Sequence, residues 1–262
     1  MDDPANLIDL ARYPVHDPDA APARRVAAEG RAQLAATGLC LLPGFLAPGA
    51  LAAVTREARA LEREAFRTES LAYGDDDGNP EKAFVLPVPA RNAKRVAGYD
   101  MLGPDSAIRR LYEWDGLAAL IRAILGVGSL HRCADPYVSC LLAYFGDGDE
   151  LGWHFDPNDG SVTLLLQEAE AGGAFEYVPD LRREGREAVA RVIDSSDRAR
   201  VRTAALLPGT LSIFNGVSAL HRVTRVAGAQ PRIMLTMSFD EAPGKVFGER
   251  ITRRFASRGR AA

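Results

Sequence analysis

The second half of this chain is a succession of short segments rich in Val, Thr, Leu and aromatic residues, separated by Gly, Pro and Asn turns. No other feature constrains the fold as strongly. Roughly eight short strands at regular spacing are typical of a β-sandwich or a barrel. The strand candidates are the stretch around 152–156 and residues 137–145, 161–167, 174–178, 200–206, 210–214, 220–226 and 232–239.

The first 136 residues follow a different, mainly helical pattern. Segments with one apolar stripe predict helices, and their ranges are 22–36, 48–66 and 106–125. Gly38 and Gly126 mark the C-terminal ends of two of these helices. A short strand candidate lies at 39–42, and the Asp-rich stretch 73–80 predicts a solvated turn.

No internal repeat, low-complexity block or clear linker divides the sequence. We therefore expect one domain over residues 1–262, in which 1–136 give mainly helical support, 137–240 form the β-core and 241–262 form a tail. A charged, helix-compatible insert at 180–198 interrupts the strands. It is either a lid over a site or a solvated helix.

Composition narrows the class of protein. The 262 residues are 47% hydrophobic, and the formal net charge of -3 gives no reason to expect nucleic acid or a membrane surface as a partner. The N-terminus lacks the regions of a secretory signal, and no apolar run reaches the ~18 residues of a membrane span, so we expect a cytoplasmic protein. The odd number of cysteines predicts buried, reduced thiols rather than a disulfide or a metal site: Cys40, Cys133 and Cys140.

Two candidate metal ligands, His154 and Asp156, lie two residues apart in the stretch Gly152-Trp153-His154-Phe155-Asp156. On an extended strand such residues project to the same face. Among the four histidines, only His221 follows this stretch. Two histidines and one carboxylate form the facial triad of non-haem Fe(II) oxygenases, which leaves coordination positions open. Taken alone, His154 is equally well an ordinary polar or core histidine; the order of strands around the three residues favours a metal site.

Arg232 begins the last long strand candidate. Alternation places Arg232 on a face with two hydroxyl side chains, whereas the other face of this strand is apolar. The guanidinium fork of an arginine is suited to bidentate capture of a carboxylate. A surface arginine at a strand start is the alternative. Arg225 has the same parity as His221 and stays a rival, whereas Arg222 points to the opposite face.

In these residues the sequence resembles the Fe(II)/2-oxoglutarate-dependent dioxygenases, over about residues 137–240. The segment 162–179 is more specifically similar to a bacterial subgroup of radical halogenases and of hydroxylases that act on free amino acids. The resemblance implies a mainly β fold with supporting helices, namely a double-stranded β-helix (jelly roll, cupin-like) behind an N-terminal helical third. The motifs that carry it are Gly152–Asp156, Gly172-Gly173, Phe175-Glu176, Leu211–Phe214, His221-Arg222-Val223 and Arg232.

The same resemblance implies the cofactors and the site. Fe(II) would be held by the catalytic residues His154, Asp156 and His221, with O2 and 2-oxoglutarate as co-substrates. The keto-acid end of 2-oxoglutarate would chelate the iron, and Arg232 would bind its distal carboxylate. Tyr144 matches a position that often contacts the co-substrate, although a core tyrosine is the alternative. Many members carry a serine where Met234 stands, so Thr163 or Thr236 would have to supply that hydroxyl.

Asp156 separates two chemistries within the resemblance. In halogenases of this family the position is Gly or Ala, which leaves a vacant site for chloride. The carboxylate here favours hydroxylation of a small polar substrate, expected to be a free amino acid or a derivative, with desaturation as an alternative outcome. Three further residues are candidate substrate contacts, each with a structural alternative: Glu176 (a salt bridge), His131 (a structural histidine) and Asn215 (a turn).

Two other classes of protein compete with an oxygenase. A β-barrel sensor that binds a ligand without turnover would not need the complete triad together with a downstream arginine. A cupin-type hydrolase or isomerase usually shows H-x-H and a Glu before the last His, and the sequence has neither. We therefore expect an enzyme with a small-molecule substrate, and assembly as a homodimer stays open.

Overall fold

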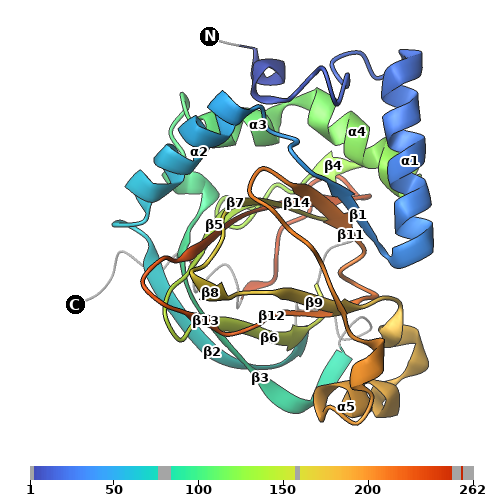
Figure 1. Cartoon of the computed structure of the whole chain (residues 1–262), viewed down its shortest axis with the longest axis vertical. Helices are drawn as coiled ribbons and strands as arrows, with labels where there is room; N and C mark the ends of the chain where they lie inside the picture. Colours follow the sequence, from blue (N-terminus) through green and yellow to red (C-terminus); the bar gives the residue numbers. More distant parts are fainter. Residues whose placement is uncertain (1–2, 76–83, 157–159, 250–254, 256–262) are drawn as a thin grey trace.

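The computed structural model describes residues 3–75, 84–156, 160–249 and 255. Antiparallel strands curl into two facing layers, and helices cover the outer side of one layer (Figure 1). This is the mainly β architecture with supporting helices that the strand pattern predicted, and it is the jelly roll that the resemblance implied.

The longer layer is continuous with the shorter one through one shared strand. In spatial order it contains β1 (Leu39–Leu42), β11 (Leu211–Phe214), β7 (Gly160–Gln167), β14 (Arg232–Asp240), β5 (Cys140–Phe145) and β3 (Phe84–Ala97). Strand β3 also pairs with the shorter layer, which contains β6 (Glu150–His154), β12 (Leu220–Val223), β9 (Phe175–Val178) and β10 (Arg202–Thr203). Smaller pairings add β2 (Phe66–Asp75) to β3, β4 (His131–Arg132) to β14, and β8 (Ala171–Gly172) to β13 (Val226–Ala227).

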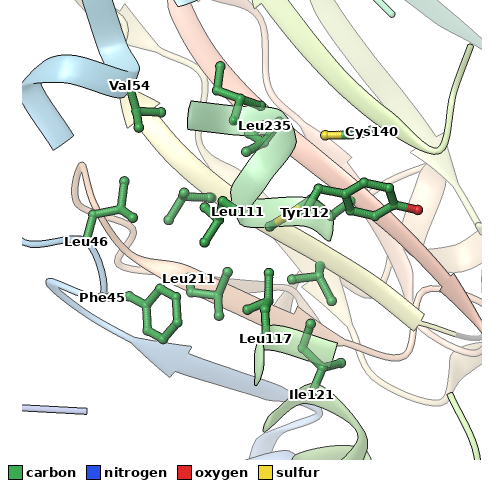
Figure 2. Close-up of a cluster of buried hydrophobic side chains, with 14 of the residues drawn as sticks. Phe45, Leu46, Val54, Leu111, Tyr112, Leu117, Ile121, Cys140, Leu211 and Leu235 are labelled. Atoms are coloured by element: carbon green, nitrogen blue, oxygen red, sulfur yellow. The ribbon is translucent and has the colours of Figure 1, made fainter. Parts of the chain in front are cut away.

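The main hydrophobic core lies between the helices and the outer face of the longer layer (Figure 2). Leu111, Leu117 and Ile121 of the helices are fully buried in the same cluster as Leu211 and Leu235 of the sheet. The helices are α1 (Ala21–Thr37), α2 (Pro48–Leu61), α3 (Ala107–Glu113) and α4 (Asp115–Leu125). The helices α1 and α4 end at the glycines that the sequence marked, both left-handed: Gly38 (φ 76°) and Gly126 (φ 74°). The predicted buried, free cysteines are confirmed.

Strand β14 separates this core from the interior of the jelly roll. Ile233, Leu235, Met237 and Phe239 pack into the helix-covered core. The alternate residues Arg232, Met234, Thr236 and Ser238 line a cavity between the layers. Since successive side chains of a strand point to opposite faces, the alternation in the sequence placed Arg232 on the interior face.

The N-terminal third is less helical than its sequence predicted. The helix predicted over 48–66 ends at Leu61, and the region after it, for which the sequence predicted no strand, contains the long paired strands β2 and β3. Two features made these strands hard to predict from the sequence. Pro87 and Pro89 lie within β3, and proline argues against a strand. The strands also carry charged residues that form surface ion pairs, such as Arg91–Glu69. Elsewhere, the helix predicted over 106–125 is interrupted at Trp114, and the strand predicted over 200–206 shortens to Arg202–Thr203.

The insert at 180–198 packs on the outer side of the shorter layer. It contains the helix α5 (Arg186–Ile193) and two short 3-10 helices, Leu181–Glu184 and Arg198–Arg200. Two more 3-10 helices lie outside the insert, at Pro4–Leu7 and Tyr99–Met101. Leu181 and Val189 share a buried cluster with Trp153, which is thus a packing residue. The insert lies on the side of this layer away from the metal ligands, so the structure does not support a lid.

None of the helices that the structure describes is long and apolar enough to cross a membrane. The predicted turn at 73–80 begins within β2, and its residues 76–80 lie outside the described part. Most of the predicted tail, 250–254 and 256–262, also lies outside it.

Candidate active site

The three predicted metal ligands converge at the inner face of the shorter layer. His154 ends β6, Asp156 follows it, and His221 lies opposite His154 in the β12–β6 pairing. One ligand atom from each residue lies within 4.8 Å of the other two. The Nε2 atoms of His154 and His221 lie 3.5 and 3.4 Å from Asp156 Oδ1. This donor set of two imidazoles and one carboxylate fits Fe(II).

Backbone carbonyls orient both imidazole rings. His154 Nδ1 lies 2.8 Å from the carbonyl oxygen of Gly152, and His221 Nδ1 lies 2.9 Å from that of Ala219. With Nδ1–H donating to a carbonyl, each ring turns its Nε2 lone pair toward Asp156. Such an outer hydrogen bond fixes the tautomer and orientation of a metal-ligating histidine.

The electrostatics of the site favour the protonation states that a metal requires. Burial and the neighbouring His221 lower the pKa of His154, which keeps its imidazole neutral. Burial alone would raise the pKa of Asp156, but the electrostatic influence of the neighbouring His221 and His154 side chains lowers that pKa well below its ordinary value. A neutral imidazole and an ionised carboxylate are the forms that bind metal.

Gly216 makes the space that the Asp156 side chain occupies. A Cβ atom on Gly216 would lie 2.1 Å from Asp156 Oδ2, closer than non-bonded atoms approach. The backbone N–H of Asp156 also donates to the Gly216 carbonyl oxygen at 2.9 Å. The Asn-Gly pair predicted a turn, and the structure adds that the glycine positions a candidate metal ligand.

A cavity of about 290 Å³ extends from the triad toward β14 and β5. This volume is near the lower end of the ~300–1,000 Å³ of typical small-molecule sites. Many of its walls are apolar: Val138, Leu141, Ala143, Phe145, Leu151, Phe175, Phe214, Val223, Met234, Phe247 and Phe255. The other nine lining residues are polar or charged, and such polar groups fix the orientation of a ligand.

Arg232 lies in this cavity and is only 3% exposed. Its Nη1 atom is buried and has no hydrogen-bond partner among the described residues. Burial lowers the pKa of Arg232 to about 10, and the charge of Glu168 acts in the opposite direction. A buried cation with an unused donor is costly unless an anion joins it. The carboxylate of a ligand would satisfy it.

The two threonines proposed as hydroxyl donors also lie in this cavity. Thr163 and Thr236 are cross-strand partners on β7 and β14, and both line the same cavity as Arg232. The Thr163 hydroxyl is 2.6 Å from that of Ser212. The neighbouring hydroxyl of Ser212 therefore fixes the position of the Thr163 hydroxyl.

Tyr144 lies on the other face of β5, and the structure does not support its predicted contact with the co-substrate. Its side chain is 1% exposed within the helix-covered core, and its hydroxyl donates to the Ala58 carbonyl oxygen of α2 at 2.7 Å. The adjacent Phe145 lines the cavity instead.

The three candidate substrate contacts also lie away from the cavity lining. Glu176 is ion-paired with Arg198 and Arg222, with the shortest N–O distances at 2.5 and 2.6 Å, so the salt-bridge alternative holds. His131 is exposed on β4. Asn215 is exposed and accepts from the backbone N–H of Ser218, as a turn residue does.

Lys94 is a cavity residue that the sequence patterns did not single out. It lies on β3, and its Nζ is 5.8 Å from the ring centroid of Phe145. Its position depends on the β2–β3 hairpin, which was predicted as loops. A correct strand assignment would have placed Lys94 and Arg95 on opposite faces.

A family model described as Halogenase D matches residues 23–246 of the chain. The chain belongs to the Halogenase D family. No curated protein is detectably similar to it. The family is named after halogenases. This member has a carboxylate, Asp156, among its candidate metal ligands.

Solved structures share the fold of this Halogenase D family member. An oxidoreductase of the 2OG-Fe(II) oxygenase family from Burkholderia pseudomallei is 20% identical, with 83% of this chain and 92% of that chain covered and a TM-score of 0.55. A Pseudomonas putida prolyl-4-hydroxylase is 17% identical, with 82% and 99% covered and a TM-score of 0.55. The epimerase SnoN, in complex with Fe3+, alpha ketoglutarate and nogalamycin RO, is 16% identical, with 87% and 89% covered and a TM-score of 0.61. The predicted fold is thereby confirmed, and solved 2-oxoglutarate-dependent oxygenases share it.

Proposed function

We propose that this protein is an Fe(II)- and 2-oxoglutarate-dependent oxygenase that hydroxylates a C–H bond of a small polar molecule, a free amino acid or a derivative. One observation carries the proposal. A triad of metal-ligand type and a buried arginine with an unused donor, among the described residues, face the same cavity.

Different residues would bind the iron and the distal carboxylate of 2-oxoglutarate, at the two ends of the cavity. When bound, Fe(II) with 2-oxoglutarate and O2 supplies the oxidising power for C–H hydroxylation and yields succinate and CO2 as co-products. His154, Asp156 and His221 would hold the iron, and Arg232 would bind the distal carboxylate of 2-oxoglutarate. The phenylalanine-rich walls would exclude water and orient the substrate.

Asp156 favours hydroxylation over halogenation. A carboxylate ligand fills the coordination position that a chloride ion would need. Gly216 provides the room for this carboxylate, and the imidazoles of His154 and His221 hold it ionised. The site is therefore built around the carboxylate rather than around a halide.

The test is the conversion of 2-oxoglutarate to succinate by the purified protein with a panel of amino acids. We expect succinate that depends on Fe(II) and O2, together with a substrate product heavier by one oxygen atom. The mass of the product separates hydroxylation from desaturation and from epimerisation, and added chloride reveals halogenation. Binding of 2-oxoglutarate without any succinate would favour a sensor, and the absence of both would refute the proposal.

A further inference from the structure

A second cavity, of about 430 Å³, adjoins the one that the metal triad faces. Arg232 and Phe175 line both, so these two residues separate the two spaces. Six other residues of its lining are glycine or alanine, namely Ala169, Gly172, Gly173, Ala174, Ala204 and Ala205. Small residues therefore keep a space open next to the arginine that would bind the distal carboxylate of 2-oxoglutarate.

Phe175 is the part of this partition that other side chains fix in place. Its ring centroid lies 5.1 Å from that of Phe214 and 5.8 Å from that of His221. Ring pairs at such distances contribute packing energy beyond the burial of their surface. Displacement of Phe175 would therefore cost these contacts and disturb a candidate metal ligand.

Arg232 is the part of the partition with freedom to move. Its Nη1 atom donates to no residue in the described part of the chain, so a shift of the guanidinium breaks no hydrogen bond at that atom. A Cβ atom on Gly173 would lie 3.0 Å from Arg232 Cδ. Because Gly173 lacks this atom, the stem of the arginine has room that any other residue there would reduce.

Glu168 determines which movement the charges favour. It is exposed and lines the second cavity, and its charge raises the pKa of Arg232 against the effect of burial. The carboxylate thus attracts the guanidinium, whereas it would repel a dianion that approached through the second cavity. This cavity is therefore suited to receive the arginine side chain and unsuited to admit 2-oxoglutarate from solvent.

We propose that Arg232 withdraws into the second cavity to bind a longer co-substrate, so that 2-oxoadipate, a 2-oxo diacid with one more methylene group, binds nearly as tightly as 2-oxoglutarate. This assignment rests on the proposed function, because it concerns the diacid that Arg232 would bind. One extra methylene in a fixed site costs ~10–200-fold in discrimination. A movable arginine reduces that discrimination, because the carboxylate of the longer diacid keeps its partner.

The variant Ala169→Leu tests the withdrawal by filling the second cavity. A Cβ atom on Gly173 would lie 3.5 Å from Ala169 Cβ, so residue 169 lies beside the space that Gly173 leaves for Arg232. Ala36→Leu, at an exposed position of α1, is the matched control. Calorimetry measures the binding of 2-oxoglutarate and of 2-oxoadipate to protein loaded with Mn(II).

A second variant, Glu168→Gln, removes the charge that attracts Arg232 without adding volume. Its control is Glu187→Gln, at an exposed position of α5. An exposed charge pair contributes little, so we expect Glu168→Gln to weaken 2-oxoadipate relative to 2-oxoglutarate by only ~2–5-fold. A shift of this ratio toward 2-oxoadipate would contradict the role given to Glu168.

In the unsubstituted protein we expect the two affinities to differ by less than ~10-fold. Ala169→Leu should lower the affinity for 2-oxoadipate ~10–100-fold, as steric overpacking does, and that for 2-oxoglutarate by less than ~3-fold. The retained 2-oxoglutarate affinity also shows that the variant is folded. Ala36→Leu should change neither affinity.

Two results would overturn the withdrawal of Arg232 alone. One is a preference of the unsubstituted protein for 2-oxoglutarate of ~10-fold or more, as in a fixed site. The other is an equal loss of both affinities in Ala169→Leu. Failure to bind either diacid would overturn the proposed function as well, so the two failures are distinguishable.

Discussion

The two ends of the cavity differ in whether their buried polar and charged groups have partners within the protein. At the metal end, two imidazoles contact one carboxylate, and backbone carbonyls accept from their remaining nitrogens. At the other end, Arg232 is buried with a donor that no described residue accepts from. The metal end is thus organised before any ligand arrives, whereas the arginine end is stabilised only when an anion binds. The comparison predicts different responses to substitution.

Removing the carboxylate should have the largest effect. Asp156→Ala eliminates a candidate metal ligand, and even loss of an outer-shell partner costs 10–100-fold in metal affinity. We expect Fe(II) affinity to fall by more than ~100-fold and succinate formation to disappear. Asp194→Ala, which removes an exposed carboxylate that accepts from Ser196, is the control. Full hydroxylation by Asp156→Ala would show that the ligand assignment is wrong.

Arg232→Met should separate ligand binding from stability. Loss of one partner of a buried charge pair costs about 2–5 kcal/mol, so the affinity for 2-oxoglutarate should fall at least ~30-fold. The free energy of unfolding of the ligand-free variant should nevertheless be unchanged, or higher than that of the unsubstituted protein by up to about 3 kcal/mol. Chemical denaturation with and without 2-oxoglutarate measures both effects.

The pH dependence of that stability has a defined sign. Burial lowers the pKa of Arg232 in the folded protein to about 10, below that of the ordinary side chain. Between these values the unfolded chain binds more protons, so the contribution of Arg232 to stability rises with pH, and its penalty is complete below pH ~10. A ligand-free Arg232→Met variant less stable than the unsubstituted protein at neutral pH would contradict this view of the arginine end.

Gly216→Ala disturbs the metal end without changing a ligand. The added methyl group would occupy the position of the Asp156 carboxylate. We expect metal affinity to fall ~10–100-fold, as for other groups that orient ligands. Gly128→Ala is the control, because a Cβ there meets no atom within 4 Å. Equal metal affinities of the two variants, measured by competition with a chelator, would show that the carboxylate is not held by this contact.

Thr163→Val should have the smallest effect. One neutral hydrogen bond contributes about 0.5–1.5 kcal/mol, so the KM for 2-oxoglutarate should rise ~2–10-fold with little change in metal affinity. Steady-state kinetics with varied 2-oxoglutarate measures it. An unchanged KM would leave Thr236 as the hydroxyl that contacts the co-substrate.

Sequence alone located the parts of the site whose strands have one apolar and one polar face. On β14 the alternation assigns Arg232 to the interior, and the spacing of His154 and Asp156 places both on one face. Strand β5 offers no such contrast, because Cys140–Phe145 is apolar on both faces and both are buried. Nothing local therefore distinguishes Tyr144, which faces the helices, from Phe145, which faces the cavity.

Contacts between distant segments explain the other differences. The partners of Glu176, Arg198 and Arg222, come from separate segments of the chain. The β2–β3 hairpin is held by pairing with β5 and β6 rather than by strand propensity. Lys94 enters the cavity only because of that pairing.

The position of β1 has a consequence for the timing of synthesis. Leu39 of β1 pairs with Phe214 of β11. This strand at the edge of the longer layer therefore has no partner until about 175 further residues have been synthesised. At ~5–20 residues per second, the ribosome needs roughly 10–35 s to supply it. During this interval an apolar edge strand is exposed to other nascent chains. Co-translational aggregation of truncated chains should therefore decline sharply once residues 211–214 have left the ribosome.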